Sequence, residues 1–521
     1  MSKALEQNLQ LIIEKGQILA LDGILHGIEK EGLRVDSQGS ISQKGHPASL
    51  GSALTHSNIT TDYSEALLEF ITPALPKAAD ALQFLQQLHC YTYQHLGDEE
   101  LWDASMPCQI DSEDAIQIAR FGDSNVGHLK YIYRVGLQYR YGKMMQTIAG
   151  IHYNFSLPET LWPVLRELQG SQKDLQAFRS DSYFTLIRNF RRSSWLLLYL
   201  FGASPALSSS FMQNREHDLE QWDKDTLYRP YATSLRMSDL GYSNKAQSAL
   251  NICFNHLDSY IQSLTQAINT TYPPYENLGV KTPQGYRQLN SNILQIENEY
   301  YSDIRPKRVA LSGEKPVHAL LERGVEYIEV RNTDINPLLP VGIDQQQADF
   351  LDAFLVTCLL SDPRDIDAHE CELINRNNSL VVNRGREPGL MLTKDNQSIS
   401  VPEWGQLILT DIEKTAQLLD QVAGDSRYSA AVAAQQAKLD DPHLTPSAQI
   451  LQQMKSTGLG YQAFILQQSR QHRDTISRIG LETEQQLHFD SLSLSSTAEQ
   501  QQIEASDTTD FDTYLANYLA Q

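Results

Sequence analysis

The stretch "GIEKEGLRV", residues 27–35, places two glutamates in a segment that is otherwise typical of a β-strand. Residues two apart on a strand point to the same face of the sheet, so Glu29 and Glu31 are expected side by side. When two carboxylates lie so near each other, each raises the pKa of the other, and the pair destabilises the fold unless a cation lies between them. The stretch therefore predicts a sheet face that binds cations.

The same pattern recurs in further segments with strand-like sequence, near residues 66–73, 146–157, 292–301 and 325–332. A charged residue in a single strand is most often on a solvated face, but its repetition favours a shared site. The polar residues that these segments and the stretch before residue 66 contribute are Asp62, Glu69, His152, Asn154, Glu297, Glu299, Tyr301, Tyr327, Glu329 and Arg331.

Carboxylates with one imidazole are ligands that suit Mg²⁺ or Mn²⁺. Several such ions on one sheet would bind the phosphates of ATP, and an arginine would stabilise the transferring group. The sequence lacks both G-x-x-x-x-G-K-[ST] and G-x-G-x-x-G after a strand, and "HECEL" at 369–373 lacks the second histidine of a zinc protease motif. Any nucleotide chemistry is therefore expected to use the carboxylate-lined sheet.

The remaining segments predict an α+β protein with a largely antiparallel sheet. Helices are expected at 3–20, 77–96, 181–201, 244–270, 344–361 and 404–423. We expect one unit over residues 1–521, with the catalytic sheet and active site within 20–340 and a mainly helical part over 405–521. The polar segment 491–510 is expected to be partly mobile.

Composition excludes several classes of partner. The chain of 521 residues has 42 Lys and Arg against 64 Asp and Glu, a net charge of −22, which argues against nucleic acids and anionic membranes. The N-terminus lacks the apolar region of a secretory signal, and "WLLLYLFGA" (195–203) is too short to span a bilayer. Five scattered cysteines favour a reducing cytoplasm.

The longest informative stretches resemble the bacterial glutamate–cysteine ligases of the proteobacterial type. They include "GIEKEGLRV", "HPASLGSALTHSNITTDYSEALLEFITP", "YRVGLQYRYGKMMQTIAGIHYNFSLP", "YATSLRMSDLGYSNKAQS" and "GVEYIEVRNTDINP". The resemblance implies a glutamine-synthetase-like curved antiparallel sheet that forms a funnel. It also implies ATP-dependent formation of γ-glutamylcysteine from L-glutamate and L-cysteine through a γ-glutamyl phosphate, the first step of glutathione synthesis. ATP is then a substrate, Mg²⁺ or Mn²⁺ the cofactor, and the chain is expected to be a monomer.

The resemblance also implies site residues. The metal ligands would be Glu29, Glu31, Asp62, Glu69, His152 and Glu329, and Arg331 and Glu69 would be catalytic. Glutamate would contact Arg236, which would pair with its α-carboxylate, and Ile148. Cysteine would contact Tyr63, Tyr133, Leu137, Gln146, Tyr242 and Tyr301. Tyr63 stands where the family often has Phe, which bears on thiol selectivity.

Three alternatives remain open from the sequence. A ligase with the same carboxylates and another acceptor amine would differ in the acceptor pocket. A metal-dependent hydrolase is disfavoured by Arg331 beside Glu329 and by the lack of a histidine-rich cluster. A non-enzymatic acidic binding protein would spread its acids over exposed faces rather than gather them in apolar strands.

Overall fold

The computed structural model describes residues 3–213, 215–241, 250, 252–311 and 314–520. The helices are α1 (Lys3–Glu14), α2 (Ala78–His95), α3 (Asn125–Tyr141), α4 (Leu161–Leu168), α5 (Leu175–Phe201), α7 (Leu257–Asn269), α8 (Pro273–Leu278), α9 (Pro316–Arg323), α10 (Gln345–Leu360), α11 (Ala368–Arg384), α12 (Val401–Ala423), α13 (Arg427–Asp440), α14 (Pro446–Thr457), α15 (Tyr461–Ile479), α16 (Thr483–Ser506) and α17 (Phe511–Ala520). No helix among these residues is long and apolar enough to cross a membrane.

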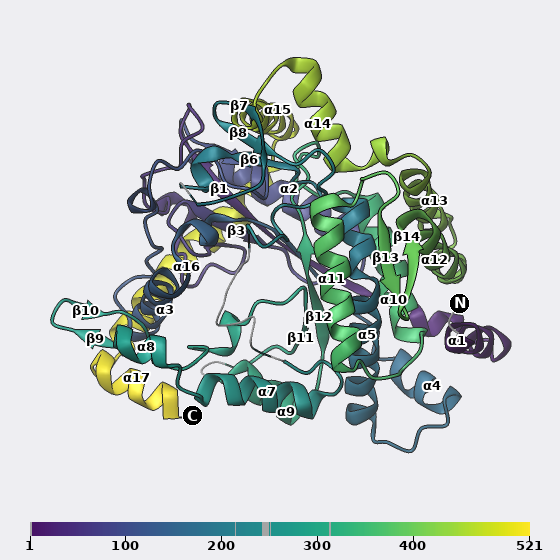
Figure 1. Ribbon diagram of the computed structural model, residues 1–521. Coiled ribbons are helices and arrows are strands. Elements are labelled where there is room, and N and C mark those ends of the chain that lie inside the picture. Colours follow the sequence, from purple (N-terminus) through teal and green to yellow (C-terminus); the bar gives the residue numbers. More distant parts are fainter. Residues whose placement is uncertain (1–2, 214, 242–249, 251, 312–313, 521) are drawn as a thin grey trace.

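One sheet of seven strands organises the molecule (Figure 1). Its strands are β1 (Leu25–Val35), β2 (Ile59–Thr61), β3 (Leu67–Ile71), β4 (Glu100–Trp102), β5 (Ile151–Ser156), β11 (Ile304–Lys307) and β12 (Tyr327–Thr333). They lie in the order β11-β12-β5-β1-β3-β2, β4 also pairs with β1, and every pair is antiparallel. The expected α+β class with an antiparallel sheet is confirmed.

The smaller sheets lie outside this one. β6 (Ala206–Ser208), β8 (Thr226–Tyr228) and β7 (Glu220–Asp223) form a three-stranded sheet. β9 (Lys281–Thr282) pairs with β10 (Gly285–Tyr286), and β13 (Met391–Lys394) pairs with β14 (Gln397–Ser400). None of these strands carries a residue of the predicted site.

The register of the large sheet determines which side chains share a face. Glu29 on β1 lies opposite His152 on β5, and Glu31 lies opposite Glu69 on β3. On the far side of β5, Asn154 lies opposite Glu329 on β12. Because directly opposed residues point to the same side of a sheet, these polar groups gather on one face.

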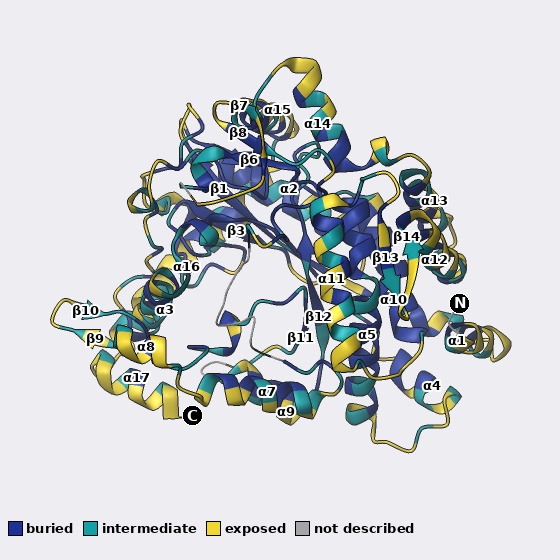
Figure 2. Ribbon diagram, viewed as in Figure 1, coloured by how far each residue is buried: buried dark blue, intermediate teal, exposed yellow. Residues whose placement is uncertain are grey.

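The other face of the sheet is packed against helices. Ile28, Tyr153, Phe155 and Val330 point to it and are fully buried. Contacts join α2 to β1, α5 to β11 and β12, and α10 to both α2 and α5. Figure 2 shows α5 and α10 as largely buried helices. The hydrophobic core therefore lies between the sheet and these helices, on the side opposite the acidic face.

Two sequence-based expectations were wrong, and a third was wrong in part. Residues 292–301 form no strand, because the segment contains the 3₁₀ helix η6 (Glu297–Glu299) and Glu299 accepts hydrogen bonds from Arg140 and from the backbone N–H of Gln295. The segment 491–510 is mostly helical, since α16 buries Ser493 and Ser496. The helix expected over 244–270 begins at Leu257 among the described residues, and 242–249 and 251 lie outside them.

Candidate active site

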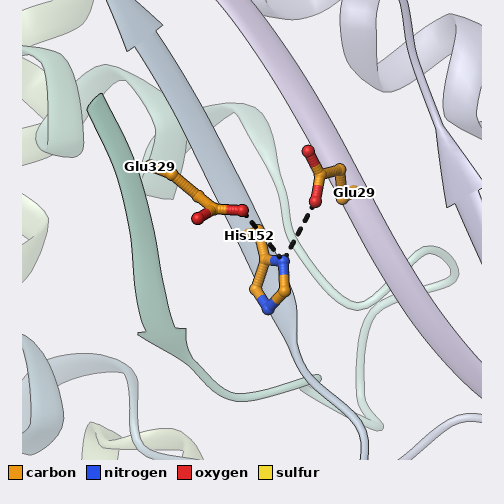
Figure 3. A group of neighbouring side chains, drawn as sticks. All are labelled: Glu29, His152 and Glu329. Carbon is orange, nitrogen blue, oxygen red and sulfur yellow. Dashed lines mark hydrogen bonds and ion pairs between the residues drawn. The ribbon is translucent and has the colours of Figure 1, made fainter. Parts of the chain in front are cut away.

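Three strands bring two carboxylates and one imidazole together. His152 Nδ1 lies 3.1 Å from Glu29 Oε2 and 3.6 Å from Glu329 Oε1. One ligand atom from each residue lies within 4.8 Å of the other two. Figure 3 shows the His152 ring on its strand with the two carboxylates reaching it from the neighbouring strands on either side. The cluster is a candidate metal centre that the strand periodicity predicted.

A second group of acids lies beside this cluster. Glu31 Oε2 accepts a hydrogen bond of 2.7 Å from the Gly150 N–H, and its Oε1 lies 3.9 Å from His152 Nε2. Burial raises the pKa of Glu31, and burial together with the charge of Glu29 raises the pKa of Glu69 well above its usual value. The negative charge of Asp62 further raises the pKa of both Glu31 and Glu69. This part of the face therefore binds protons, or any cation, more readily than exposed carboxylates do.

Cations balance the acids at the other end of the cluster. Burial alone would raise the pKa of Glu329, but Lys307 and Arg331 outweigh it and hold that pKa well below its usual value. Burial also opposes ionisation of Glu29, yet the hydrogen bond from His152 keeps its pKa lowered. Both carboxylates are therefore ionised at neutral pH and can act as metal ligands.

Arg331 is placed at the junction of the two groups. Its Nη1 donates to Glu329 Oε1 at 3.1 Å and lies 3.4 Å from His152 Nδ1. Its Nε is buried and has no hydrogen-bond partner among the described residues. A guanidinium with an unused donor on an acidic face can bind an anion that enters with its own cations.

A cavity of about 510 Å³ opens in front of the acidic face. It brings together ten of the predicted residues: Glu31, Asp62, Tyr63, Tyr133, Leu137, Gln146, Ile148, His152, Tyr301 and Arg331. A larger cavity of about 770 Å³ lies among α1, α5, α10, α11 and α12, but none of the predicted residues lines it. The chemistry and the smaller cavity coincide, so we assign the site there.

Among the other predicted residues, Glu29, Glu69, Glu329 and Arg236 do not line the cavity. Arg236 is fully buried, donates to the backbone oxygens of Arg331 (2.9 Å) and Thr333 (3.2 Å), and lies 3.7 Å from Asp334 Oδ1. Gly150 makes room for it, since a Cβ there would lie 2.1 Å from Arg236 Nη2. Tyr242 lies outside the described residues.

Sequence reasoning missed several cations and one thiol at the site. Arg305 on β11 lies opposite Glu329, and Lys307 Nζ lies 3.6 Å from Glu329 Oε1. The i, i+2 spacing of these two cations in "IRPK" was a signal, but nothing local showed that this strand lies next to β12. Three further residues line the cavity from helices: Arg134, Arg191 and Cys371.

Comparisons with known proteins identify the family of this chain. The glutamate–cysteine ligase family model matches residues 9–381. A glutamate–cysteine ligase from Pseudomonas paraeruginosa is 52% identical over 520 residues, which cover 100% of this chain and 98% of that protein. One from Pseudomonas putida is 52% identical over 520 residues, covering 100% and 99%.

Two solved structures share the fold. A crystal structure of glutamate–cysteine ligase from Francisella tularensis in complex with AMP aligns with a TM-score of 0.90 at 37% identity, covering 96% of this chain and 98% of that one. A bifunctional glutathione synthetase from Pasteurella multocida aligns with a TM-score of 0.74 at 26% identity, covering 93% of this chain and 58% of that one.

Proposed function

The chain belongs to the glutamate–cysteine ligase family, and we propose which of its residues carry the family's reaction. As a member of this family, the protein is an ATP-dependent ligase that makes γ-glutamylcysteine, in the first step of glutathione synthesis. The γ-carboxylate of glutamate attacks the terminal phosphorus of ATP and releases ADP. The amine of cysteine then attacks the γ-glutamyl phosphate, and phosphate leaves.

The observation that carries the proposal is the acidic face of the sheet in front of a cavity. We assign divalent cations, Mg²⁺ or Mn²⁺, to Glu29, Glu31, Asp62, Glu69, His152 and Glu329. The donor set fits such ions, because it consists of carboxylate oxygens and one imidazole. Glu329 Oε2 is buried and has no hydrogen-bond partner among the described residues, so it has an oxygen to offer. When bound, the cations neutralise charge on the transferring phosphoryl group.

The chain's own residues orient the reactants. Arg331 would donate to the transferring phosphoryl oxygens, and its contact with Glu329 at 3.1 Å keeps it pointed at the cluster. Glu69, assigned a catalytic as well as a metal-binding role, lies opposite Glu31 in the sheet. Arg236 would pair with the α-carboxylate of glutamate, with Ile148 beside it. In the structure that guanidinium lies directly against Gly150, where any side chain would displace it.

The aromatic part of the cavity is the proposed acceptor pocket. Tyr133 and Leu137 come from α3, Gln146 from the 3₁₀ helix η4 (Met144–Thr147), and Tyr301 from the segment after η6. Tyr63 and Tyr242 complete the assigned set. Burial raises the pKa of the Tyr63 hydroxyl, so that group stays protonated and acts only as a neutral hydrogen-bonding group. We further propose that the chain is a single, monomeric ligase unit that works in the cytoplasm.

An assay of ADP and phosphate release tests this proposal. The protein is supplied with ATP and Mg²⁺, with glutamate alone, with one acceptor alone, or with both. We expect steady release only with both amino acids, together with a product of the mass of γ-glutamylcysteine. Release with neither amino acid would indicate a hydrolase, and release with ammonium but not with cysteine would indicate a ligase with another acceptor.

A series of acceptors sharpens the assignment of the pocket. L-2-Aminobutyrate carries a methyl group where cysteine has its thiol, and a group of that size in an apolar pocket is worth about 1–3 kcal/mol. It should therefore be a usable but poorer acceptor, glycine should be worse, and lysine should fail. Equal use of cysteine, glycine and lysine would contradict the assigned pocket.

A further inference from the structure

Two walls of the proposed acceptor pocket come from elements outside the large sheet. Helix α3 supplies Tyr133 and Leu137, and the segment 288–301 supplies Tyr300 and Tyr301. The sheet cannot determine the distance between these walls, because neither wall is one of its strands. Some other contact must hold them at the width that suits a small amino acid.

A buried ion pair joins the two walls. Arg140 Nη1 on α3 donates to Glu299 Oε1 at 3.0 Å, and neither side chain has any exposed area. Tyr141 also donates to Glu299 Oε1, and Glu299 Oε2 accepts from the Gln295 N–H at 2.7 Å. Because removal of one partner leaves the other charge buried, the pair has a strong preference for this one arrangement.

Arg140 extends the connection along the second wall. Its Nε and Nη2 donate to Gln288 Oε1 at 3.0 and 2.9 Å, and Nη2 also donates to the Asn290 backbone oxygen at 2.8 Å. Its guanidinium also lies 4.1 Å from the centre of the Tyr275 ring. Lysine could keep the charge here but not this fork of donors.

Gln295 makes a second connection at the level of Tyr133. Its Nε2 donates to the Tyr133 backbone oxygen at 3.2 Å, and its Oε1 accepts from the Leu289 N–H at 3.0 Å. Gly136, inside α3, faces it, and a Cβ at this position would lie 2.1 Å from Gln295 Oε1. Glycine inside a helix weakens the helix, and here its benefit is the close approach of the second wall.

We propose that Arg140, Gln295 and Glu299 are positioning residues that determine the width of the acceptor pocket and thereby which amines the enzyme accepts. Arg140, Gln295 and Gly136 do not line the cavity, so they act through Tyr133, Leu137 and Tyr301. The inference rests on the proposed function, since it takes the aromatic part of the cavity as the acceptor pocket. Glutamate is assigned to Arg236 and Ile148 and ATP to the sheet face, and none of the hydrogen bonds described above ends on these groups.

The test is Arg140→Lys, which keeps the positive charge and loses the fork. Steady-state kinetics are measured for ATP, glutamate, 2-aminobutyrate and the longer norvaline. A displacement of a pocket wall by about 1 Å can cost on the order of 100-fold, so we expect the Michaelis constant for 2-aminobutyrate to rise by about 10- to 100-fold. The constants for glutamate and ATP should change by less than about 2-fold, and the preference for 2-aminobutyrate over norvaline should fall.

Arg34→Lys is the matched control. Arg34 is also fully buried, pairs with Glu99 at 2.9 Å and donates to three backbone oxygens, but none of these partners belongs to α3 or to the segment 288–301. Its replacement should lower thermal stability to a similar degree without changing the ratio of the two acceptors. A change of that ratio in Arg34→Lys as large as in Arg140→Lys would mean that destabilisation alone explains the effect, and would overturn the inference.

Gly136→Ala gives a second variant that favours the helix and disturbs only the approach of Gln295. It should also raise the Michaelis constant for 2-aminobutyrate selectively, with α3 retained. Equal changes for all three substrates, or an unchanged acceptor ratio in Arg140→Lys or Gly136→Ala, would overturn the inference. If the wild-type enzyme joined neither cysteine nor these acceptors to glutamate, the proposed function itself would be wrong, which the wild-type assay reveals separately.

Discussion

The two faces of strand β1 differ in whether their charged side chains are paired with opposite charges. On the helix-covered face, Lys30 Nζ lies 2.8 Å from Asp103 Oδ1, and His26 Nε2 lies 2.8 Å from Asp352 Oδ2. On the cavity face, Glu31 lies directly opposite another acid, Glu69. Charges on the first face are thus neutralised within the fold, whereas those on the second leave an excess of negative charge for a ligand.

The comparison separates residues that stabilise the fold from residues that bind. A buried ion pair is costly to break, because the remaining charge is left without a partner. Crowded carboxylates are costly in the folded state itself, and a bound cation removes that cost. Substitutions on the two faces should therefore differ in whether they change stability or activity.

The largest expected effect is on the helix-covered face. Lys30→Met leaves Asp103 buried without its cation and should lower the free energy of unfolding by about 3–5 kcal/mol, as measured by urea denaturation. Glu69→Gln, measured without Mg²⁺, should not lower it, since glutamine resembles the protonated form that the raised pKa of Glu69 favours. If the two variants were equally destabilised, the distinction between the faces would fail.

The next effect is on the cavity face. Glu29→Gln removes an anionic ligand and keeps its size, so activity should fall by about 10- to 100-fold. The wild-type protein should gain about 2.7 kcal/mol of stability at 100 times the dissociation constant of Mg²⁺. The variant should need a higher Mg²⁺ concentration for the same shift in melting temperature. Near-normal turnover of Glu29→Gln at low Mg²⁺ would contradict the assignment of Glu29 as a metal ligand.

Arg236 is buried as deeply as the helix-side cations, yet it is assigned to the substrate. Arg236→Lys keeps the charge and loses the planar fork, so the Michaelis constant for glutamate should rise by about 10-fold. The constant for ATP should change much less. Equal changes would place Arg236 with the structural cations, with its hydrogen bonds to the backbone oxygens of Arg331 and Thr333 as its role.

The last comparison concerns His56, at the edge of the sheet before β2, and involves the pH dependence of stability alone. Burial lowers its pKa from 6.5 to about 4, with help from His488, and its Nδ1 accepts from the N–H groups of Asn58 and Ile59. As the pH falls, His56 takes up a proton in the unfolded chain before it does so in the folded protein. The neutral His56 therefore contributes fully to the stability of the fold above pH 6.5, and this contribution is lost as the pH falls toward about 4.

His56→Asn keeps a hydrogen-bond acceptor for the N–H groups of Asn58 and Ile59 but has no group that takes up a proton in this pH range. Its unfolding free energy should therefore depend less on pH than that of the wild type between these two values. Urea denaturation of both proteins at several pH values measures the difference. An identical pH dependence would mean that His56 does not titrate differently in the folded and unfolded states.

Local pattern was sufficient for the elements with regular periodicity and failed where side-chain contacts override it. The strand with Glu29 and Glu31 and the strand with Glu329 and Arg331 are where the sequence predicted them. The segment around Glu299 was also expected to be a strand, but its acid binds Arg140 on α3. Glu299 accepts hydrogen bonds from residues of a helix 158 and 159 positions earlier in the chain. Contacts of that range cannot be predicted from the neighbouring residues in the sequence.

Which residues of each strand share a face could be predicted from the sequence, because alternation is a property of the extended backbone. Glu29 pairs with Glu31 and Glu329 with Arg331 in this way. The order of the strands could not be predicted, and it is this order, with β5 between β1 and β12, that lets His152 reach both Glu29 and Glu329. That order depends on which apolar faces pack together across more than 100 residues, and the same packing gave Lys30 its partner Asp103 and brought α3 against the segment with Glu299.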